Sequence, residues 1–321
     1  MDDPNRLFQE ASPGQLRQIF AEALDEPHIH QARLLDGGLF NTTYHVTYGE
    51  AREEAVLRLG PVNRHLLMGH EENLIRAEVH VCALCEQHGI PSSHVLAWDC
   101  SRRIVDRDYM IVRYIPSVPM NRAELSAEER NALYQEMGAF LLRFHQIDGS
   151  SYGYVSRILA GQGCSSWGDA LLLEAEDILD RLETHLGYDG AAVRTAFRQN
   201  KALLDDAGPP RLLHTDLWEG NVLLDRETHT ILAVIDGDRA VYGDPDLEFA
   251  SSWMGHPSLL KGYGIDPAAD ISPDRKTRRA LYQLYYVLLE AYTPFEKYGD
   301  RSPCDNSTQR IKELLAELES L

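Results

Sequence analysis

The sequence predicts an α+β fold with two lobes, a smaller sheet-rich lobe over residues 1–116 and a larger helical lobe over residues 117–321. Three observations lead to this prediction. Runs rich in β-branched and aromatic residues, typical of strands, lie in the first part. Apolar residues recur at helical spacing over residues 128–145 and 279–292, in the second part. Pro116 interrupts the chain after a strand-like run, where a connection between lobes is expected.

The first lobe is expected to contain a hairpin that begins with a glycine-containing turn. Residues 43–48 alternate as a strand does, and residues 55–59 form the next expected strand. Gly37 and Gly38 lie in the turn before them, where backbone N–H groups can approach a phosphate because no Cβ intervenes. The turn lacks a full Gly-x-Gly-x-x-Gly pattern, so an ordinary hairpin turn explains it equally well.

The composition indicates a folded, cytoplasmic protein. Hydrophobic residues make up 44% of the 321, enough for a large core. No run of 18 apolar residues occurs, and the N-terminus lacks the basic and apolar regions of a signal peptide. The five cysteines are scattered and odd in number, which argues against a disulfide framework.

The charge balance excludes some partners. A net charge of −19 disfavours nucleic acid and anionic membranes, because both bind basic surfaces. It is compatible with a small-molecule acceptor that is cationic or polyhydroxylated. The sequence carries no signal for an oligomeric state.

The residues that point to chemistry lie in one stretch. Asp216 is followed by Asn221 five residues later, and Asp236 comes after an expected hairpin. One carboxylate can position and deprotonate an attacking hydroxyl, while an amide and a second carboxylate offer hard oxygen ligands to Mg²⁺ on nucleotide phosphates. Asp and Asn are also common in turns. Their combination at these offsets favours a phosphoryl-transfer site.

This stretch resembles the aminoglycoside phosphotransferase and choline kinase-like enzymes, which share the protein-kinase fold. The family motif His-Gly-Asp-x-x-x-x-Asn matches His214, Asp216 and Asn221, and Ile-Asp-x-x-x-x-x-x-Gly-Asp-Pro matches residues 235–245. Thr215 stands where glycine is usual, which leaves the subfamily open. The resemblance implies that Asp216 is the catalytic base.

The resemblance extends over about residues 34–298 and implies a nucleotide site for ATP or GTP with Mg²⁺. Asn221 and Asp236 would hold the metal, and the glycine-containing turn would lie over the phosphates. Arg58 would contact the phosphates and pair with Glu78.

The resemblance also implies a hinge between the lobes, where the backbone groups of Arg113 and Ile115 would bind the adenine edge. Two alternatives stay open. Arg58 and Glu78 could each be an exposed surface charge, and a structural linker would give the same sequence pattern as a hinge.

The acceptor site is expected in the helical lobe. In small-molecule kinases of this group, a helical insert and the C-terminal helices line the acceptor pocket. The segment 169–183 is rich in carboxylates, and we expect one or two of them to contact the acceptor, although a solvated helix face explains most of them. The candidates are Asp169, Glu174, Asp177 and Glu290.

We therefore expect an O-phosphotransferase acting on a small-molecule hydroxyl, of an aminoglycoside or another antibiotic. A metabolic kinase of the same fold is one alternative, with a fructosamine, choline-like or homoserine-like acceptor. The pattern His-x-Asp-Leu-Trp-x-Gly-Asn also resembles that of fructosamine kinases. A nucleotide-binding pseudokinase that acts as a regulatory module is a second alternative. Fold alone does not fix the substrate.

Overall fold

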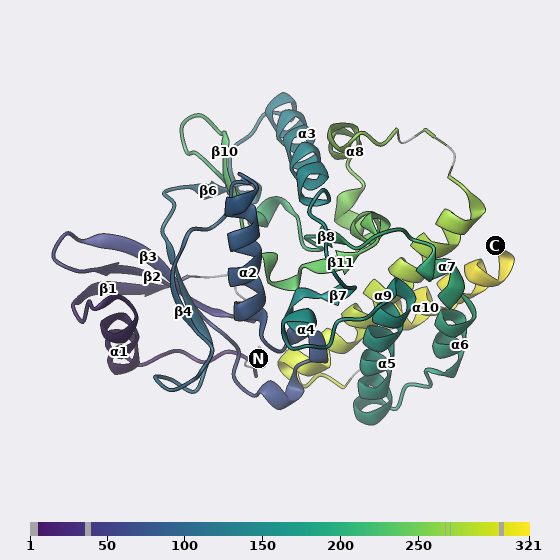
Figure 1. Ribbon diagram of the computed structural model, residues 1–321, viewed down its shortest axis with the longest axis horizontal. Coiled ribbons are helices and arrows are strands. Elements are labelled where there is room, and N and C mark those ends of the chain that lie inside the picture. The colour runs from purple at the N-terminus through teal and green to yellow at the C-terminus, as the bar shows by residue number, and fades with distance from the viewer. Residues whose placement is uncertain (1–5, 36–39, 267, 270, 302–304) are drawn as a thin grey trace.

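The computed structural model confirms the expected α+β fold with a sheet-rich N-terminal lobe and a helical C-terminal lobe (Figure 1). Strand β5 (Tyr109–Arg113) ends the first sheet, and β6 (Val118–Pro119) belongs to a sheet of the second lobe. The chain therefore passes from one sheet to the other between Arg113 and Val118. Pro116 lies in this connection, and we retain it as the proposed boundary. The structure describes the chain except for residues 1–5, 36–39, 267, 270 and 302–304.

The N-terminal lobe is built on one antiparallel sheet with the strand order β1-β2-β3-β5-β4. Side chains of β2 alternate between buried and half-buried positions, because successive residues of a strand point to opposite faces. The remaining strands are β1 (Ile29–Leu34), β2 (Thr42–Tyr48), β3 (Glu53–Leu59) and β4 (Val95–Asp99).

Two helices pack on this sheet. Helix α1 (Pro13–Leu24) begins with a capping box at Ser12, and its apolar stripe joins the core formed with β2 and β3. Helix α2 (Leu74–Gln87) starts at Leu74, and the residues before it form short 3-10 turns. Its Ile75 packs on β5.

The C-terminal lobe contains the long helices and two small sheets, ordered β10-β9-β6 and β7-β11-β8. Helices α5 and α9 form its largest core. The helices are α3 (Ala127–Phe144), α4 (Val155–Leu159), α5 (Trp167–Leu186), α6 (Ala191–Gln199), α7 (Lys201–Asp205), α8 (Pro257–Tyr263), α9 (Pro273–Tyr298) and α10 (Asp305–Ser320). The strands are β7 (Gly153–Tyr154), β8 (Arg211–Leu213), β9 (Val222–Leu224), β10 (Ile231–Val234) and β11 (Val241–Gly243).

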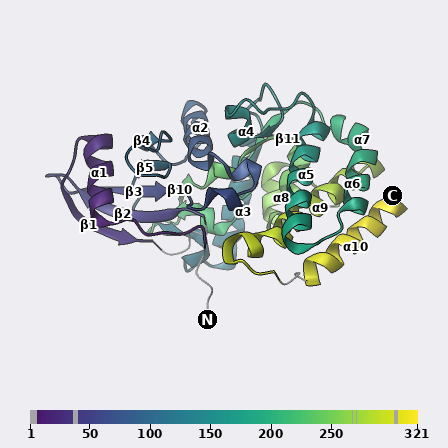
Figure 2. The same ribbon diagram turned by 90° about the horizontal axis from the view of Figure 1, so that it is seen from below.

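Helix α9 connects the two lobes. It has 26 residues and exceeds the expected segment 279–292 at both ends. In both views it crosses the C-terminal lobe and ends beside the N-terminal lobe (Figures 1 and 2). There the N–H of Arg6 donates to the carbonyl of Lys297 at 2.7 Å. Over the described ranges, every helix is too short or too polar to cross a membrane.

Candidate active site

The catalytic stretch begins where β8 ends, in a loop whose backbone is fixed by one carboxylate. Glu248 is buried, and its two oxygens accept the N–H groups of His214 at 2.8 Å and Thr215 at 2.9 Å. This residue lies in a 3-10 turn after β11. Sequence reasoning gave Glu248 no role, since nothing local shows which distant backbone groups a carboxylate will accept.

The backbone conformation of Thr215 shows why glycine is usual at this position. Its φ of 62° lies in the left-handed region, which costs a β-branched residue free energy on the order of 1–3 kcal/mol. The Thr215 hydroxyl donates to the carbonyl of Arg239 at 2.8 Å, a hydrogen bond that glycine cannot make. The hydroxyl therefore offsets part of the backbone strain.

Asp216 and Asn221 lie against each other. The amide nitrogen of Asn221 donates to the backbone carbonyl of Asp216 at 2.8 Å and to its carboxylate at 3.2 Å. With its nitrogen used in this way, Asn221 has its side-chain oxygen as the remaining ligand atom. Burial raises the pKa of Asp216, and the nearby charge of Asp236 raises it further. A carboxylate in such a place is a suitable general base.

Arg58 collects carboxylates from three segments of the chain. Its guanidinium contacts Glu78 of α2 and donates to Asp236 at 2.6 Å, and Asp238 lies 3.5 Å away. Burial alone would raise the pKa of Asp236, but the charge of Arg58 lowers it below its ordinary value. The expected pair of Arg58 and Glu78 is therefore formed in the structure, and it is buried on the Glu78 side.

A divalent cation fits beside this cluster. Among the described residues, Glu78, Asp236 and Asp238 each place one carboxylate oxygen within 4.8 Å of the others. The N–H of Ile235 donates to the carbonyl of Asn221 at 2.9 Å, which ties together the two segments with the expected ligands. Such hard oxygen donors suit Mg²⁺. Asp238 was not among the expected residues, although it lies only two positions after Asp236.

The adenine contacts of Arg113 and Ile115 stay predictions, and the structure shows which of their backbone groups are already used. The N–H of Arg113 donates to the carbonyl of His94 at 2.9 Å, so this donor is used within the first lobe and does not face a nucleotide. Ile115 lies beyond β5, and its carbonyl accepts the hydroxyl of Ser117 at 2.9 Å. Gly37 and Gly38, expected over the phosphates, lie outside the described residues.

Two of the four expected acceptor carboxylates are held by other side chains. Glu174 is buried at 3% exposure, where it contacts Arg157 and lies 3.0 Å from the ring of His70. Asp177 accepts the N–H of Gly69 at 2.7 Å and lies 3.2 Å from Arg181. These contacts join α5 to the N-terminal lobe, so both carboxylates have a structural role.

The other two expected carboxylates lie at the surface. Asp169, near the start of α5, is exposed and lies 3.1 Å from the ammonium of Lys201. Glu290 is exposed on α9, where partial burial raises the pKa of its carboxyl group. Of the four candidates, these two remain accessible to a solute.

Exposed aromatic side chains near the catalytic loop were not expected from the sequence. Trp218 lies two residues after Asp216 and is 43% exposed. Trp253 is 39% exposed, and its ring packs against Tyr286 at 6.3 Å between centroids. Burial raises the pKa of the Tyr286 hydroxyl, and the charges of Glu248 and Asp216 add to this effect. These rings give an acceptor an apolar surface beside the proposed base.

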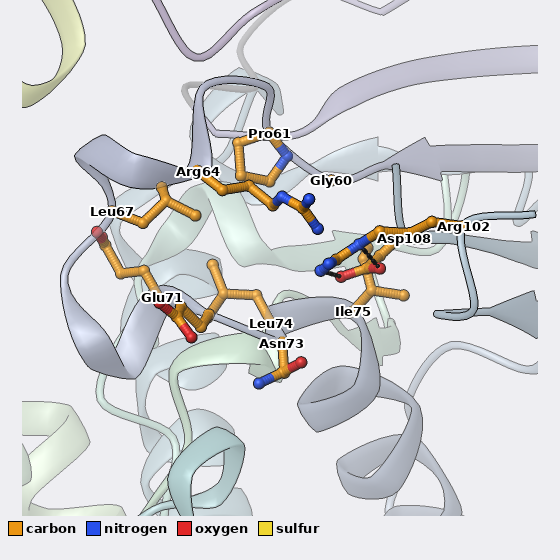
Figure 3. Close-up of a pocket in the computed structure, with 11 residues that line it drawn as sticks. Gly60, Pro61, Arg64, Leu67, Glu71, Asn73, Leu74, Ile75, Arg102 and Asp108 are labelled. Carbon is orange, nitrogen blue, oxygen red and sulfur yellow. Dashed lines mark hydrogen bonds and ion pairs between the residues drawn. The ribbon is translucent and has the colours of Figure 1, made fainter. Parts of the chain in front are cut away.

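A hollow of about 200 Å³ lies in the N-terminal lobe and is separate from this site (Figure 3). It lies between the end of β3 and the start of α2, and one side carries the ion pair of Arg102 with Asp108 at 2.7 Å. None of the lining residues is Asp216, Asn221 or Asp236. The hollow is therefore not the phosphoryl-transfer site.

Known proteins are similar to this chain in sequence. The model of the phosphotransferase enzyme family matches residues 31–281. Two curated relatives carry the name "probable ketoamine kinase". One from Enterococcus faecium is 35% identical over 96 residues, and one from Lactiplantibacillus plantarum is 28% identical over 181 residues. These matches cover 29% and 51% of this chain and 32% and 61% of the relatives, so the chain spans less than two thirds of either one.

Solved structures share the fold. A "putative fructosamine-3-kinase" from Haemophilus somnus has a TM-score of 0.67 at 16% identity, over 94% of this chain and 96% of that one. The gentamicin-APH(2″)-IIa complex has a TM-score of 0.60 at 16% identity, over 98% of both chains. At these identities the similarity establishes the two-lobed, protein-kinase-like architecture.

Proposed function

The chain belongs to the phosphotransferase enzyme family, and from this premise we propose that it transfers the γ-phosphoryl group of ATP or GTP to a hydroxyl group of a small molecule. One observation carries the proposal. Asp216, Asn221 and Asp236 converge with the Arg58–Glu78 pair, although the chain separates Arg58 from Asp236 by 178 residues. Phosphoryl transfer needs this combination of a base, metal ligands and a phosphate-binding cation.

In this mechanism Asp216 orients the acceptor hydroxyl and takes its proton. The hydroxyl oxygen forms a bond to the γ-phosphorus while the bond from that phosphorus to the bridging oxygen breaks. The nucleoside diphosphate leaves with the electron pair. Asn221 and Asp236 would hold Mg²⁺, which supplies charge neutralisation on the phosphates when bound. Arg58, kept in place by Glu78, contacts the phosphates nearest the nucleoside.

For the acceptor, the relatives support the metabolic alternative better than antibiotic resistance. Both curated relatives are named for ketoamines, whereas the gentamicin complex shares only the fold at 16% identity. A fructosamine combines hydroxyl groups with an amine. The amine suits the net charge of −19, and the exposed ring of Trp218 offers a surface for the carbon face of a sugar.

The test is a transfer assay in which purified protein, Mg²⁺ and ATP or GTP meet a panel of acceptors. The panel contains a fructosamine, choline, homoserine and gentamicin, and mass spectrometry detects a product heavier by one phosphoryl group. We expect the fructosamine to be phosphorylated at the highest kcat/KM. Phosphorylation of gentamicin and of no other acceptor would instead favour a function in antibiotic resistance. Nucleotide binding without transfer to any acceptor would favour a regulatory pseudokinase.

The matched variant is Asp216→Asn. It keeps the size and hydrogen-bonding geometry of the side chain but cannot take a proton, so we expect kcat to fall by about 10²–10⁴-fold while the nucleotide Kd changes little. The wild type should lose kcat as pH falls through the raised pKa of Asp216, because protonation removes the base. Near wild-type turnover of Asp216→Asn would exclude this residue from the mechanism.

A further inference from the structure

Two cations outside the family motifs lie beside the catalytic loop, where the carbonyl of Arg239 accepts the hydroxyl of Thr215, the residue before Asp216. Arg239 follows Asp236 by three residues, and Lys297 lies at the end of α9. Phe40, at the edge of the glycine-containing turn, contacts both: its ring centroid lies 4.4 Å from the guanidinium carbon of Arg239 and 4.3 Å from the ammonium of Lys297. The charge of Asp216 acts on both cations. One aromatic ring therefore joins two cations near the proposed base.

Of the carboxylates that the structure describes, none forms an ion pair with Lys297, although the charges of Glu71, of Glu296 when it is ionised, and of Asp216 act to raise its pKa. The carboxylate of Glu71 accepts a hydrogen bond from the guanidinium of Arg239 at 2.8 Å, so its charge is paired with Arg239. Glu296 is fully buried, and burial together with the charge of Glu71 raises its pKa to about 10, so it is neutral at physiological pH. Within the part of the chain that the structure describes, no ion pair joins Lys297 to a carboxylate. The Lys297 residue is nevertheless only 6% exposed.

A buried ammonium that is not in direct contact with a carboxylate is costly, because several kcal/mol of hydration are lost when an ion leaves water. Burial and the neighbouring charge of Arg239 lower the pKa of Lys297 to about 8, so the group remains mostly protonated near pH 7. The missing negative charge can come from a ligand beside Asp216. In the proposed reaction the ligand group at that place is the transferring phosphoryl group, whose non-bridging oxygens carry negative charge.

We infer that Lys297 is a further catalytic residue, whose ammonium donates to a non-bridging oxygen of the γ-phosphoryl group during transfer. This inference rests on the proposed function. The acceptor oxygen forms a bond to the γ-phosphorus while the bond from that phosphorus to the bridging oxygen breaks. The proton of the acceptor hydroxyl goes to Asp216. Lys297 remains protonated throughout and contributes only its charge and a hydrogen bond. Arg239 and Phe40 act as positioning residues, because they hold the lysine chain end at the site.

The test compares nucleotides that differ only in the γ-phosphoryl group. Calorimetry with Mg²⁺ measures the affinity of AMP-PNP, a non-hydrolysable ATP analogue, and of ADP for wild type and Lys297→Met. We expect the variant to lose about 10–100-fold in AMP-PNP affinity, the worth of a charge-assisted hydrogen bond, with ADP affinity unchanged. If Lys297 only held Phe40 in place, Lys297→Met would change the affinities for AMP-PNP and ADP by the same factor.

Lys312→Met is the matched control, because it removes the same charge from an exposed position on α10. It should leave both affinities at the wild-type value, whereas Lys297→Arg should keep most of the preference for AMP-PNP. Equal losses for AMP-PNP and ADP, or no loss, would overturn the role of Lys297 and leave the proposed function standing. A wild-type protein that binds neither nucleotide would overturn both proposals.

A measurement on the unmodified chain covers the case in which Lys297→Met does not fold. Wild type is treated with an acetylating reagent in the presence of AMP-PNP or ADP, and peptide mass spectrometry follows acetylation of Lys297 and Lys312. We expect AMP-PNP to protect Lys297 at least several-fold more than ADP does, with Lys312 equally reactive in both. Equal acetylation of Lys297 under the two conditions would refute the contact.

Discussion

Arg58 is the residue on which the charge balance of the nucleotide site depends. It lies beside three carboxylates, of which those of Glu78 and Asp238 are buried and that of Asp236 is partly exposed. Carboxylates so close to each other repel strongly when their cation is removed. Arg58 therefore has a structural role even before a nucleotide binds.

The variant Arg58→Met tests this role. It retains a side chain of similar length but leaves the three carboxylates without a cation, so we expect the free energy of unfolding to fall by about 3–5 kcal/mol. Chemical denaturation measures the change, and millimolar Mg²⁺ should restore more stability to the variant than to wild type. Arg17→Met, at an exposed position of α1, should change stability by less than about 0.5 kcal/mol. An unchanged unfolding free energy for Arg58→Met would show that the carboxylates are protonated or apart.

At the scale of elements, the catalytic loop is supported by the packing of α3 against α8. A Cβ on Gly138 of α3 would lie 2.1 Å from the carbonyl oxygen of Leu259, so the two helices touch backbone to backbone. His145, directly after α3, lies 2.9 Å from the hydroxyl of Tyr263 and 3.4 Å from the carboxylate of Glu248. This packing therefore positions the glutamate that holds the loop.

Gly138→Ala should force the two helices apart. Overpacking of this kind costs about 1–3 kcal/mol, and we expect a lower Tm in calorimetry together with a reduced kcat, because Glu248 would move. Gly14→Ala is the control: in α1 the nearest atom to the added Cβ is the Ser12 hydroxyl at 3.8 Å, so the methyl group fits. Wild-type stability in Gly138→Ala would mean that α8 is not held against α3.

At the scale of the whole molecule, the lobes meet at a pair of buried carboxyl groups. Glu71 comes from the segment before α2 and Glu296 from the end of α9. Arg239 keeps Glu71 ionised, while burial and the charge of Glu71 keep Glu296 protonated at neutral pH, so that Glu296 donates to Glu71. The contact between the lobes thus contains one shared proton.

This proton makes stability depend on pH. The pKa of Glu296 is about 10 in the folded chain and about 4.5 when unfolded, so its contribution opposes folding increasingly as pH rises between these values. Glu296→Gln keeps a donor toward Glu71 without needing a proton. We expect the Tm of Glu296→Gln to match that of wild type near pH 5. Near pH 8.5 it should exceed the wild-type Tm by a few degrees, which corresponds to a gain of roughly 1–2 kcal/mol in the free energy of unfolding.

The control for this prediction is Glu317→Gln, which makes the same chemical change at an exposed position of α10. Its Tm relative to wild type should not vary with pH between 5 and 8.5. A Tm difference for Glu296→Gln that stays constant across this range would show that Glu296 is ionised in the folded chain.

The sequence by itself determined the fold class, the long helices and the stretch from Asp216 to Asp236. These features are local: strand alternation and helical spacing repeat within a few residues, and a base and two metal ligands on one loop and hairpin keep fixed offsets. The pairing of Arg58 with Glu78 was expected only from the family resemblance, because the two residues lie on different elements, β3 and α2.

Only the tertiary structure decided which partner each charged side chain has. Glu174 looked like an acceptor contact, but the fold places it against Arg157 and His70 in the interior. The sequence analysis assigned no role to Lys297, but the end of α9 packs on the first lobe and buries this residue beside Phe40. Periodicity indicates which face of a helix is buried, but burial of a charge depends on segments more than a hundred residues away, whose approach only the folded chain defines.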